Sequence, residues 1–286
     1  MALLSIVTIN RNNAAGLQRT MQSVLEQTVD DIEYVVVDGA STDGSVDVIR
    51  QFETGFGDRL KWVSEPDAGI YNAMNKGIRM ASGDYIQILN SGDILAAPDV
   101  TEKMTTALKR HNAVVPILYG NMIRNFGNGK LKRDRSGADR KESDLKPHEV
   151  EWTMYDFIRG TVNHDPTYIH RSLYEKYGLY DDSLRIASDW KWFVNAVVYG
   201  GEKLYYVPVD VTVFDTTGIS ETNLEAREKE RRTELEKMLP AAILKDYDKY
   251  HFPIGQYKRL KKHHMWRLVC FMERVLFKLE KWHVLR

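Results

Sequence analysis

Short apolar runs alternate with stretches of helical spacing over the first 120 residues, and this alternation constrains the fold more than any other feature. The runs are rich in β-branched residues and predict buried strands at residues 4–9, 32–37, 60–63, 85–89 and 114–119. Apolar residues at helical spacing predict helices at residues 13–27, 43–52, 69–81 and 98–110. The alternation favours an α/β fold, in which helices cover both faces of a mainly parallel sheet.

The rest of the chain is less regular. Residues 124–150 are polar and charge-rich, and they predict a long loop that is either a lid over a site or an ordinary excursion. Beyond this loop, strands are predicted at 167–170 and 204–207, and helices at 172–177, 188–199 and 221–239. Residues 256–286 predict a long basic helix with an apolar face.

Composition and charge exclude several classes of protein. The chain has 286 residues, of which 43% are hydrophobic, so it is a globular protein with a sizeable core and not a disordered chain. The single cysteine, Cys270, excludes an intrachain disulfide framework and a cysteine-rich zinc site. Neither a basic leader nor a run of 18 uncharged apolar residues occurs, so the expected location is cytoplasmic.

The net charge of 0 hides an asymmetry. Residues 251–286 contain nine Lys or Arg and two Glu, a net charge of +7, which leaves −7 on the first 250 residues. A basic tail on an acidic body favours an anionic surface as the partner of the tail and argues against a nucleic-acid partner for the body.

Polar residues follow the ends of four predicted strands, which is where open parallel sheets bind ligands. Asp38 follows a buried run directly, five residues too early to cap the next helix, so we expect it to contact a ligand. Asp43 is better explained as the cap of that helix. Asp93 follows Gly92 and is either a turn residue or, together with a diphosphate, a ligand for Mg²⁺ or Mn²⁺.

Two residues of the second half of the chain are also candidates for a catalytic role. Asp189 falls at the start of a predicted helix, where the helix dipole favours an acid, but a carboxylate there could also act as general base toward a hydroxyl. His164 lies in an Asn-His-Asp-Pro segment and, taken alone, is better explained as a structural histidine.

Four sequence blocks resemble family 2 glycosyltransferases in their order and spacing. They are SIVTINR at 5–11, VDGASTDGS at 37–45, SEPDAGIYNAMNKG at 64–77 and ASGDYIQILNSGD at 81–93. Residues 187–190 and 214–220 also resemble this family, so the resemblance covers about residues 3–220. It implies an inverting enzyme with the GT-A (Rossmann-like) fold that uses a nucleotide-activated sugar.

The resemblance also implies roles for individual residues. Asp93 would bind the metal, Asp189 would be the catalytic base, and His164 would lie near the donor diphosphate or the acceptor. Asp38 would hydrogen-bond the base of the donor. The other donor-side residues would be Thr8, Ile9, Asn10, Glu65, Asp67, Asn72, Ser91, Gly92 and Lys76, the last of which would face a phosphate.

Taken together, these roles describe a metal-dependent glycosyltransferase of the hexosyltransferase type. A UDP-sugar is the expected donor, with GDP- and dTDP-sugars as alternatives, and Mn²⁺ or Mg²⁺ is the expected cofactor. The acceptor would be a hydroxyl of a glycan or lipid-linked sugar in cell-surface polysaccharide synthesis. The glycosyltransferase domain is expected over residues 1–240, with its donor half at about 1–123 and its catalytic half at about 150–220. Residues 241–286 would form a helical basic extension.

Two other functions compete with this interpretation. A sugar-1-phosphate nucleotidyltransferase would need a Gly-rich basic phosphate loop, whereas residues 10–16 contain one Arg and one Gly. A non-catalytic glycan- or nucleotide-binding module would bind without turnover. For residues 256–286, contact with the inner face of the membrane, packing on the domain and a homodimer interface all remain open.

Overall fold

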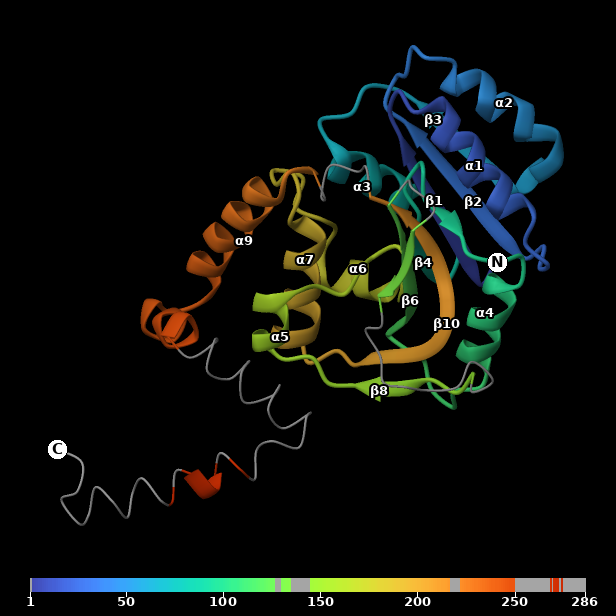
Figure 1. The fold of residues 1–286 in the computed structure, drawn as a ribbon. Helices are drawn as coiled ribbons and strands as arrows, with labels where there is room; N and C mark the ends of the chain where they lie inside the picture. The colour runs from blue at the N-terminus through green and yellow to red at the C-terminus, as the bar shows by residue number, and fades with distance from the viewer. Residues whose placement is uncertain are drawn as a thin grey trace. The chain divides into compact units, whose positions relative to one another are not determined.

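The computed structural model describes residues 2–126, 130–134, 145–216, 222–249, 268, 270–272 and 274. The chain divides into two compact units, Met1–Arg232 and Thr233–Arg286. The first unit contains one ten-stranded sheet whose main path runs β3-β2-β1-β4-β9-β6-β10-β5 (Figure 1).

The first four strands along this path are parallel, as predicted. They are β3 (Leu60–Ser64), β2 (Ile32–Asp38), β1 (Leu4–Asn10) and β4 (Tyr85–Ile88). Between and after them come α1 (Ala14–Leu25), α2 (Ser45–Phe56), a 3-10 turn (Gly57–Arg59), α3 (Ile70–Met80) and α4 (Val100–Lys109). The predicted α/β architecture is therefore confirmed, with helix ends that differ from the predicted ones by a few residues.

Helices cover both faces of β1 and β2, which explains why these strands are continuous apolar runs. On one face, Ile6, Tyr34 and Val36 pack in a cluster with side chains of α1 and α2. On the other face, Gly77 of α3 lies so close to Val7 that a Cβ at position 77 would be 2.2 Å from a methyl carbon of the valine. The absence of a side chain at Gly77 therefore allows α3 to sit directly on the sheet.

The second half of the sheet is mixed. It contains β9 (Thr167–His170), β6 (Ile117–Asn125), β10 (Leu204–Asp215), β5 (Ile94–Leu95), β7 (Leu131–Asp134) and β8 (His148–Val150). β9 pairs antiparallel with both β4 and β6, whereas β6 and β10 are parallel. The helices here are α5 (Met154–Arg159), α6 (Ser172–Tyr177) and α7 (Ser188–Phe193), and a π-helix (Val194–Tyr199) continues α7.

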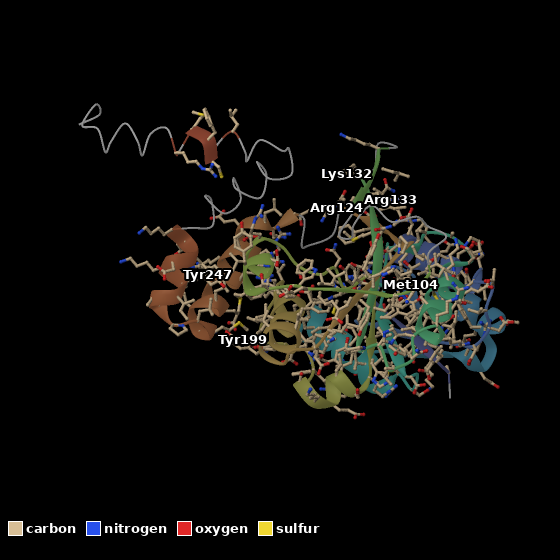
Figure 2. All side chains as sticks on the ribbon, turned by 90° about the horizontal axis from the view of Figure 1, so that it is seen from below. Met104, Arg124, Lys132, Arg133, Tyr199 and Tyr247 are labelled. Atoms are coloured by element: carbon tan, nitrogen blue, oxygen red, sulfur yellow. The ribbon has the colours of Figure 1, made fainter. Side chains whose placement is uncertain are left out.

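Two predictions for this half need correction. The polar segment 124–150 is not wholly a loop, because β6 continues to Asn125 and both β7 and β8 pair with the sheet. The strand predicted at 204–207 extends to Asp215, because a register shift between Tyr206 and Asp210 lets the strand continue past Pro208. Figure 2 shows Arg124 and Arg133 where β6 and β7 run together.

The last elements are helical. α9 (Leu224–Met238) begins in the first unit and ends in the second, and residues 241–249 form a further helix. Of the basic segment predicted at 256–286, only Leu268, Arg274 and residues 270–272 are described, and Phe271 and Met272 are exposed. In the described part of the chain, no helix is long and apolar enough to cross a membrane.

Candidate active site

A cavity of about 840 Å³ opens at the carboxyl ends of the parallel strands and extends along β6, β10 and α9. Seven of the thirteen predicted site residues line it, namely Ile9, Asn10, Asp67, Ser91, Asp93, His164 and Asp189. The other six do not line it, namely Thr8, Asp38, Glu65, Asn72, Lys76 and Gly92. The structure thus brings the predicted metal ligand, base and histidine, which come from distant parts of the sequence, into one cavity.

Asp38 is fully buried at the end of β2, beneath the cavity lining. Its Oδ1 accepts hydrogen bonds from Nδ2 of Asn10 at 2.8 Å and from Oγ of Ser41 at 2.5 Å, and its Oδ2 accepts one from Oγ of Ser64 at 2.6 Å. Burial alone would raise the pKa of Asp38, but these hydrogen bonds outweigh it and lower the pKa. The carboxylate fixes Asn10, which lines the cavity, while direct contact with the base of a donor stays a prediction.

Asp43 has the capping role predicted for it. One oxygen accepts a hydrogen bond from the backbone N–H of Ser45 at 3.1 Å, at the start of α2. The other accepts one from the backbone N–H of Ala14 at 2.8 Å, at the start of α1. A single carboxylate therefore stabilises two helix N-termini.

The predicted phosphate-facing lysine has protein partners. Nζ of Lys76 lies 2.8 Å from Glu65 and 2.7 Å from Asp67, and it donates to the carbonyl of Pro66 at 2.9 Å. These contacts of Lys76 stabilise the loop that precedes α3. Asn72 donates to Asp182 at 3.2 Å and so joins α3 to the second half of the domain.

Two further predicted donor residues lie behind the cavity lining and support it. The hydroxyl of Thr8 is buried and accepts a hydrogen bond from Tyr34 at 3.0 Å. Gly92 has a φ of 109°, a left-handed conformation that suits glycine, and its backbone N–H donates to Thr20 at 2.9 Å. This turn carries Asp93 away from the end of β4 and into the cavity wall.

Asp93 lies among acidic neighbours. It is 3% exposed, and its Oδ1 accepts a hydrogen bond from the backbone N–H of Asp215 at 2.7 Å. Burial and, next, the carboxyl group of Asp165 raise its pKa well above the ordinary value. Oδ1 of Asp165 is itself buried without a hydrogen-bond partner in the described structure. A divalent cation would relieve the crowding of these carboxyl groups, so the residues present fit a metal.

The donor set supplied by protein is small. Within the described ranges, no group of three His, Cys, Asp or Glu side chains has the arrangement of a complete metal site. A cation at Asp93 would therefore need oxygen ligands from elsewhere, and a diphosphate supplies such ligands.

Asp189 occupies the first turn of α7 on the opposite side of His164 from Asp165. Its Oδ2 lies 3.1 Å from Nδ1 of His164, and its Oδ1 accepts a hydrogen bond from the hydroxyl of Tyr71 at 2.9 Å. Burial alone would raise the pKa of Asp189, but His164 outweighs burial and lowers it. Asp189 is thus an ionised carboxylate with two positioned partners.

His164 lies between two carboxylates. Its Nε2 is 3.5 Å from Asp165 and 3.0 Å from the side-chain amide of Asn90. Burial alone would lower the pKa of His164, but the charges of Asp165 and Asp189 raise it to about 9. The imidazole is therefore protonated at neutral pH and carries a positive charge between the carboxylates of Asp165 and Asp189.

The sequence did not single out the residues that α9 and α5 bring to the cavity. The backbone N–H groups of Arg185, Ile186 and Ala187, just before α7, donate to the carboxylate of Glu230 at 2.7, 2.8 and 2.8 Å. Further lining residues absent from the predicted set are Tyr71, Arg124, Trp152, Arg159, Asp165, Asp215, Arg227 and Arg231. Of these, Tyr71, Asp165 and Asp215 lie inside segments that the sequence marks, whereas the residues of α9 have no such signal.

Together, the mixed sheet and the cavity at the ends of its parallel strands have the GT-A architecture, the fold of solved glycosyltransferases. The comparisons with known proteins agree. A model of the family "Glycosyl transferase family 2" matches residues 5–178. The chain belongs to this family.

The relatives include proteins of mycobacteria. An uncharacterized glycosyltransferase of Mycobacterium tuberculosis is 35% identical over 223 residues, which is 76% of each chain. A PGL/p-HBAD biosynthesis glycosyltransferase of Mycobacterium bovis is 26% identical over 216 residues, which is 76% of this chain and 78% of the relative.

Solved structures share the fold. S. aureus TarS 1–349 in complex with UDP-GlcNAc superposes with a TM-score of 0.60 at 15% identity, and the match covers 77% of this chain and 60% of the solved chain. The mannosyltransferase PcManGT of Pyrobaculum calidifontis, in complex with GDP-Man and Mn²⁺, has a TM-score of 0.54 at 19% identity, with 74% and 56% covered. This chain thus spans less than two thirds of both solved chains.

Proposed function

We propose that this chain transfers a sugar from a UDP-sugar to a hydroxyl of a glycan or lipid-linked acceptor, with inversion at the anomeric carbon. Asp189 is the general base in this proposal. The observation that carries it is the ionised Asp189 carboxylate, held by His164 and Tyr71 in the cavity that also contains Asp93. An ionised carboxylate that lines the cavity can accept the proton of an acceptor hydroxyl.

The reaction follows from these groups. Asp189 takes the proton of the acceptor hydroxyl while that oxygen attacks the anomeric carbon. The bond from this carbon to the phosphate oxygen breaks on the opposite face, and the nucleoside diphosphate leaves with both electrons. The protonated His164 balances the charge of Asp189 and fixes its orientation. No covalent intermediate with the enzyme is required.

Mn²⁺ or Mg²⁺ is the proposed cofactor, with Asp93 as its protein ligand. The crowded carboxyl groups of Asp93 and Asp165 support this proposal. When bound, the cation supplies electrostatic stabilisation of the diphosphate that leaves. In the same cavity, Ile9, Asn10, Asp67 and Ser91 are the proposed donor-binding residues.

The UDP-sugar and the acceptor class rest partly on relatives. TarS was solved with UDP-GlcNAc and PcManGT with GDP-Man, so UDP is the proposed nucleotide and GDP the main alternative. The relative named for PGL/p-HBAD biosynthesis supports a role in making a surface glycan or glycolipid.

The proposed domain boundaries and location follow the sequence. Residues 1–240 form the proposed catalytic domain, and the basic extension, most of which lies outside the described residues, is proposed to contact an anionic membrane surface. Flotation with liposomes that contain anionic lipid tests the extension. Equal flotation of the full chain and of a chain without residues 256–286 would contradict this contact.

Thermal unfolding with UDP, GDP, dTDP and ADP, each with and without Mn²⁺, tests the donor site. A nucleotide at about 100 times its dissociation constant should add roughly 2.7 kcal/mol to the free energy of unfolding. We expect a Mn²⁺-dependent shift with UDP that Asp93→Ala removes. No shift with any nucleotide would contradict the transferase and favour a glycan-binding module.

Asp189→Asn tests the chemistry separately. We expect this variant to bind UDP and Mn²⁺ as the wild type does, because Asn keeps the shape of the side chain. Release of UDP from the UDP-sugar, with water or glycan as acceptor, should fall by about 10²–10⁴ fold. Equal turnover by wild type and variant would exclude Asp189 as the base.

A further inference from the structure

Two arginines of α9, Arg227 and Arg231, line the cavity together with Asp189. Residues four apart lie on the same face of a helix, so their side chains reach the cavity side by side. Both are largely buried, with side chains that are 23% and 13% exposed.

Arg231 lies against Trp190, in the helical turn that carries the proposed base. Its guanidinium carbon is 5.7 Å from the ring centroid of Trp190, the residue that follows Asp189. Glu230, the neighbour of Arg231 on α9, accepts the three hydrogen bonds from the segment before α7. The ring contact of Arg231 and the backbone hydrogen bonds to Glu230 hold α9 against the start of α7. Arg231 therefore keeps its place on the flank of Asp189.

The guanidinium of Arg231 is incompletely paired. Its Nε is buried and has no hydrogen-bond partner among the described residues, and its Nη1 lies 3.9 Å from Glu228, whose side chain is mostly exposed. Burial lowers the pKa of Arg231, the charge of Asp189 opposes this effect, and the positive charge of Arg227 adds to it. A buried N–H without an acceptor beside a second cation is an arrangement that a bound anion would complete.

The geometry of an inverting attack indicates which of the two substrates carries that anion. In an inverting transfer, the base and the leaving diphosphate are on opposite faces of the anomeric carbon. The flank of Asp189 therefore faces the acceptor, whereas Asp93 faces the diphosphate. We propose that the acceptor carries an anionic group, a carboxylate or a phosphate, which Arg231 and Arg227 bind. This inference rests on the proposed role of Asp189 as the base.

The two arginines also reduce the electrostatic repulsion of an anionic acceptor. An anionic acceptor would be repelled by the carboxyl groups that line the cavity, and the guanidinium groups of Arg231 and Arg227 offset this repulsion. Arginine suits this task because its planar fork matches both carboxylate and phosphate oxygens.

An array of glycans tests the inference, with the chain loaded with UDP and Mn²⁺. The array presents neutral glycans, counterparts that contain uronic acids, and counterparts that carry phosphate. Binding is measured for the wild type, Arg231→Gln, Arg231→Lys and the control Arg232→Gln, which removes an exposed charge of the same helix outside the cavity. Nucleotide-dependent thermal unfolding of each variant is measured in parallel.

We expect the wild type to bind acidic glycans at least about tenfold more tightly than their neutral counterparts. Arg231→Gln should abolish this preference, Arg231→Lys should keep part of it because the charge remains, and Arg232→Gln should keep all of it. Preference for the uronic acid set or the phosphate set identifies which anion the acceptor carries.

Three results would overturn the inference. One is equal binding of acidic and neutral glycans, and another is the absence of any bound acidic glycan. The third is a loss of UDP affinity in Arg231→Gln without a change in glycan preference, which would assign this guanidinium to the donor diphosphate. Failure of the wild type to bind any nucleotide is a separate result, which would contradict the proposed function itself.

Discussion

Nδ1 of His164 lies 3.1 Å from Oδ2 of Asp189, and this contact joins the residue implied as the catalytic base to the histidine implied near the donor diphosphate or the acceptor. The opposite edge of the imidazole meets Asp165, so that one positive charge is shared between two carboxylates. The pair is therefore an electrostatic unit whose stability depends on pH.

We expect the free energy of unfolding to fall as pH rises from about 6.5 to about 9. The folded protein raises the pKa of His164 from 6.5 to about 9, so the stabilisation is complete below the lower value and is lost through the upper one. The loss should be on the order of 3 kcal/mol. Denaturant unfolding across this range measures it.

His164→Gln should remove that part of the pH dependence. The control His170→Gln removes a histidine outside the cavity, so it tests whether loss of any imidazole has the same effect. Identical pH profiles for wild type and His164→Gln would mean that folding does not raise the pKa of His164.

Asp93→Asn should stabilise the protein in the absence of metal. The pKa of Asp93 is raised in the folded state, so the ionised carboxylate opposes folding at neutral pH, whereas a neutral amide still accepts the hydrogen bond from Asp215. A gain of about 1 kcal/mol is expected in denaturant unfolding with a chelator. The same variant should lose the shift with UDP and Mn²⁺. The control Asp58→Asn changes an exposed acid, and a destabilised Asp93→Asn would contradict the account of crowded carboxyl groups.

Glu230→Gln should loosen the segment before α7. The carboxylate accepts three backbone hydrogen bonds, whereas a glutamine has one oxygen and would turn an N–H₂ group toward these donors. Hydrogen exchange of the amides of residues 185–187 should become at least about tenfold faster. Glu225→Gln, an exposed change on the same helix, is the control, and unchanged exchange in Glu230→Gln would show that other contacts hold the segment.

Gly77→Ala should destabilise the domain by about 1–3 kcal/mol, because the new methyl group would overlap Val7 on β1. Gly55→Ala is the matched change on α2, where the nearest atoms belong to the flexible side chain of Leu25, and its effect should stay within about 1 kcal/mol. Thermal or denaturant unfolding compares the two. Equal effects would show that α3 can move away from the sheet at little cost.

The sequence predicts the first half of the fold well because β1 and β2 are buried on both faces and are therefore continuous apolar runs. β7 was missed because its residues, Leu131–Asp134, are mostly charged, and only backbone hydrogen bonds to β6 make the segment a strand. β10 is longer than the predicted strand because the bulge between Tyr206 and Asp210 accommodates Pro208, a residue that ordinarily interrupts a strand.

Some residues of the candidate site could be predicted from the sequence, and others could not. Asp93, His164 and Asp189 could be named from motifs, and the structure gathers them in one cavity. Glu230 and Arg231 could not be named, because ten of the fifteen residues of α9 are charged and no apolar period marks one face. Their place depends on how α9 packs on the segment before α7, which is a tertiary property.

Two hydrogen bonds between residues of the cavity lining join positions that are far apart in the chain. Tyr71 and Asp189 are 118 positions apart, and Asp93 and Asp215 are 122 apart. During synthesis from the N-terminus, the parallel strands and Asp93 leave the ribosome long before Asp189 does. A nascent chain would therefore carry the residues proposed to hold a donor while it still lacks the base proposed to consume it, so catalytic competence would be the last property acquired.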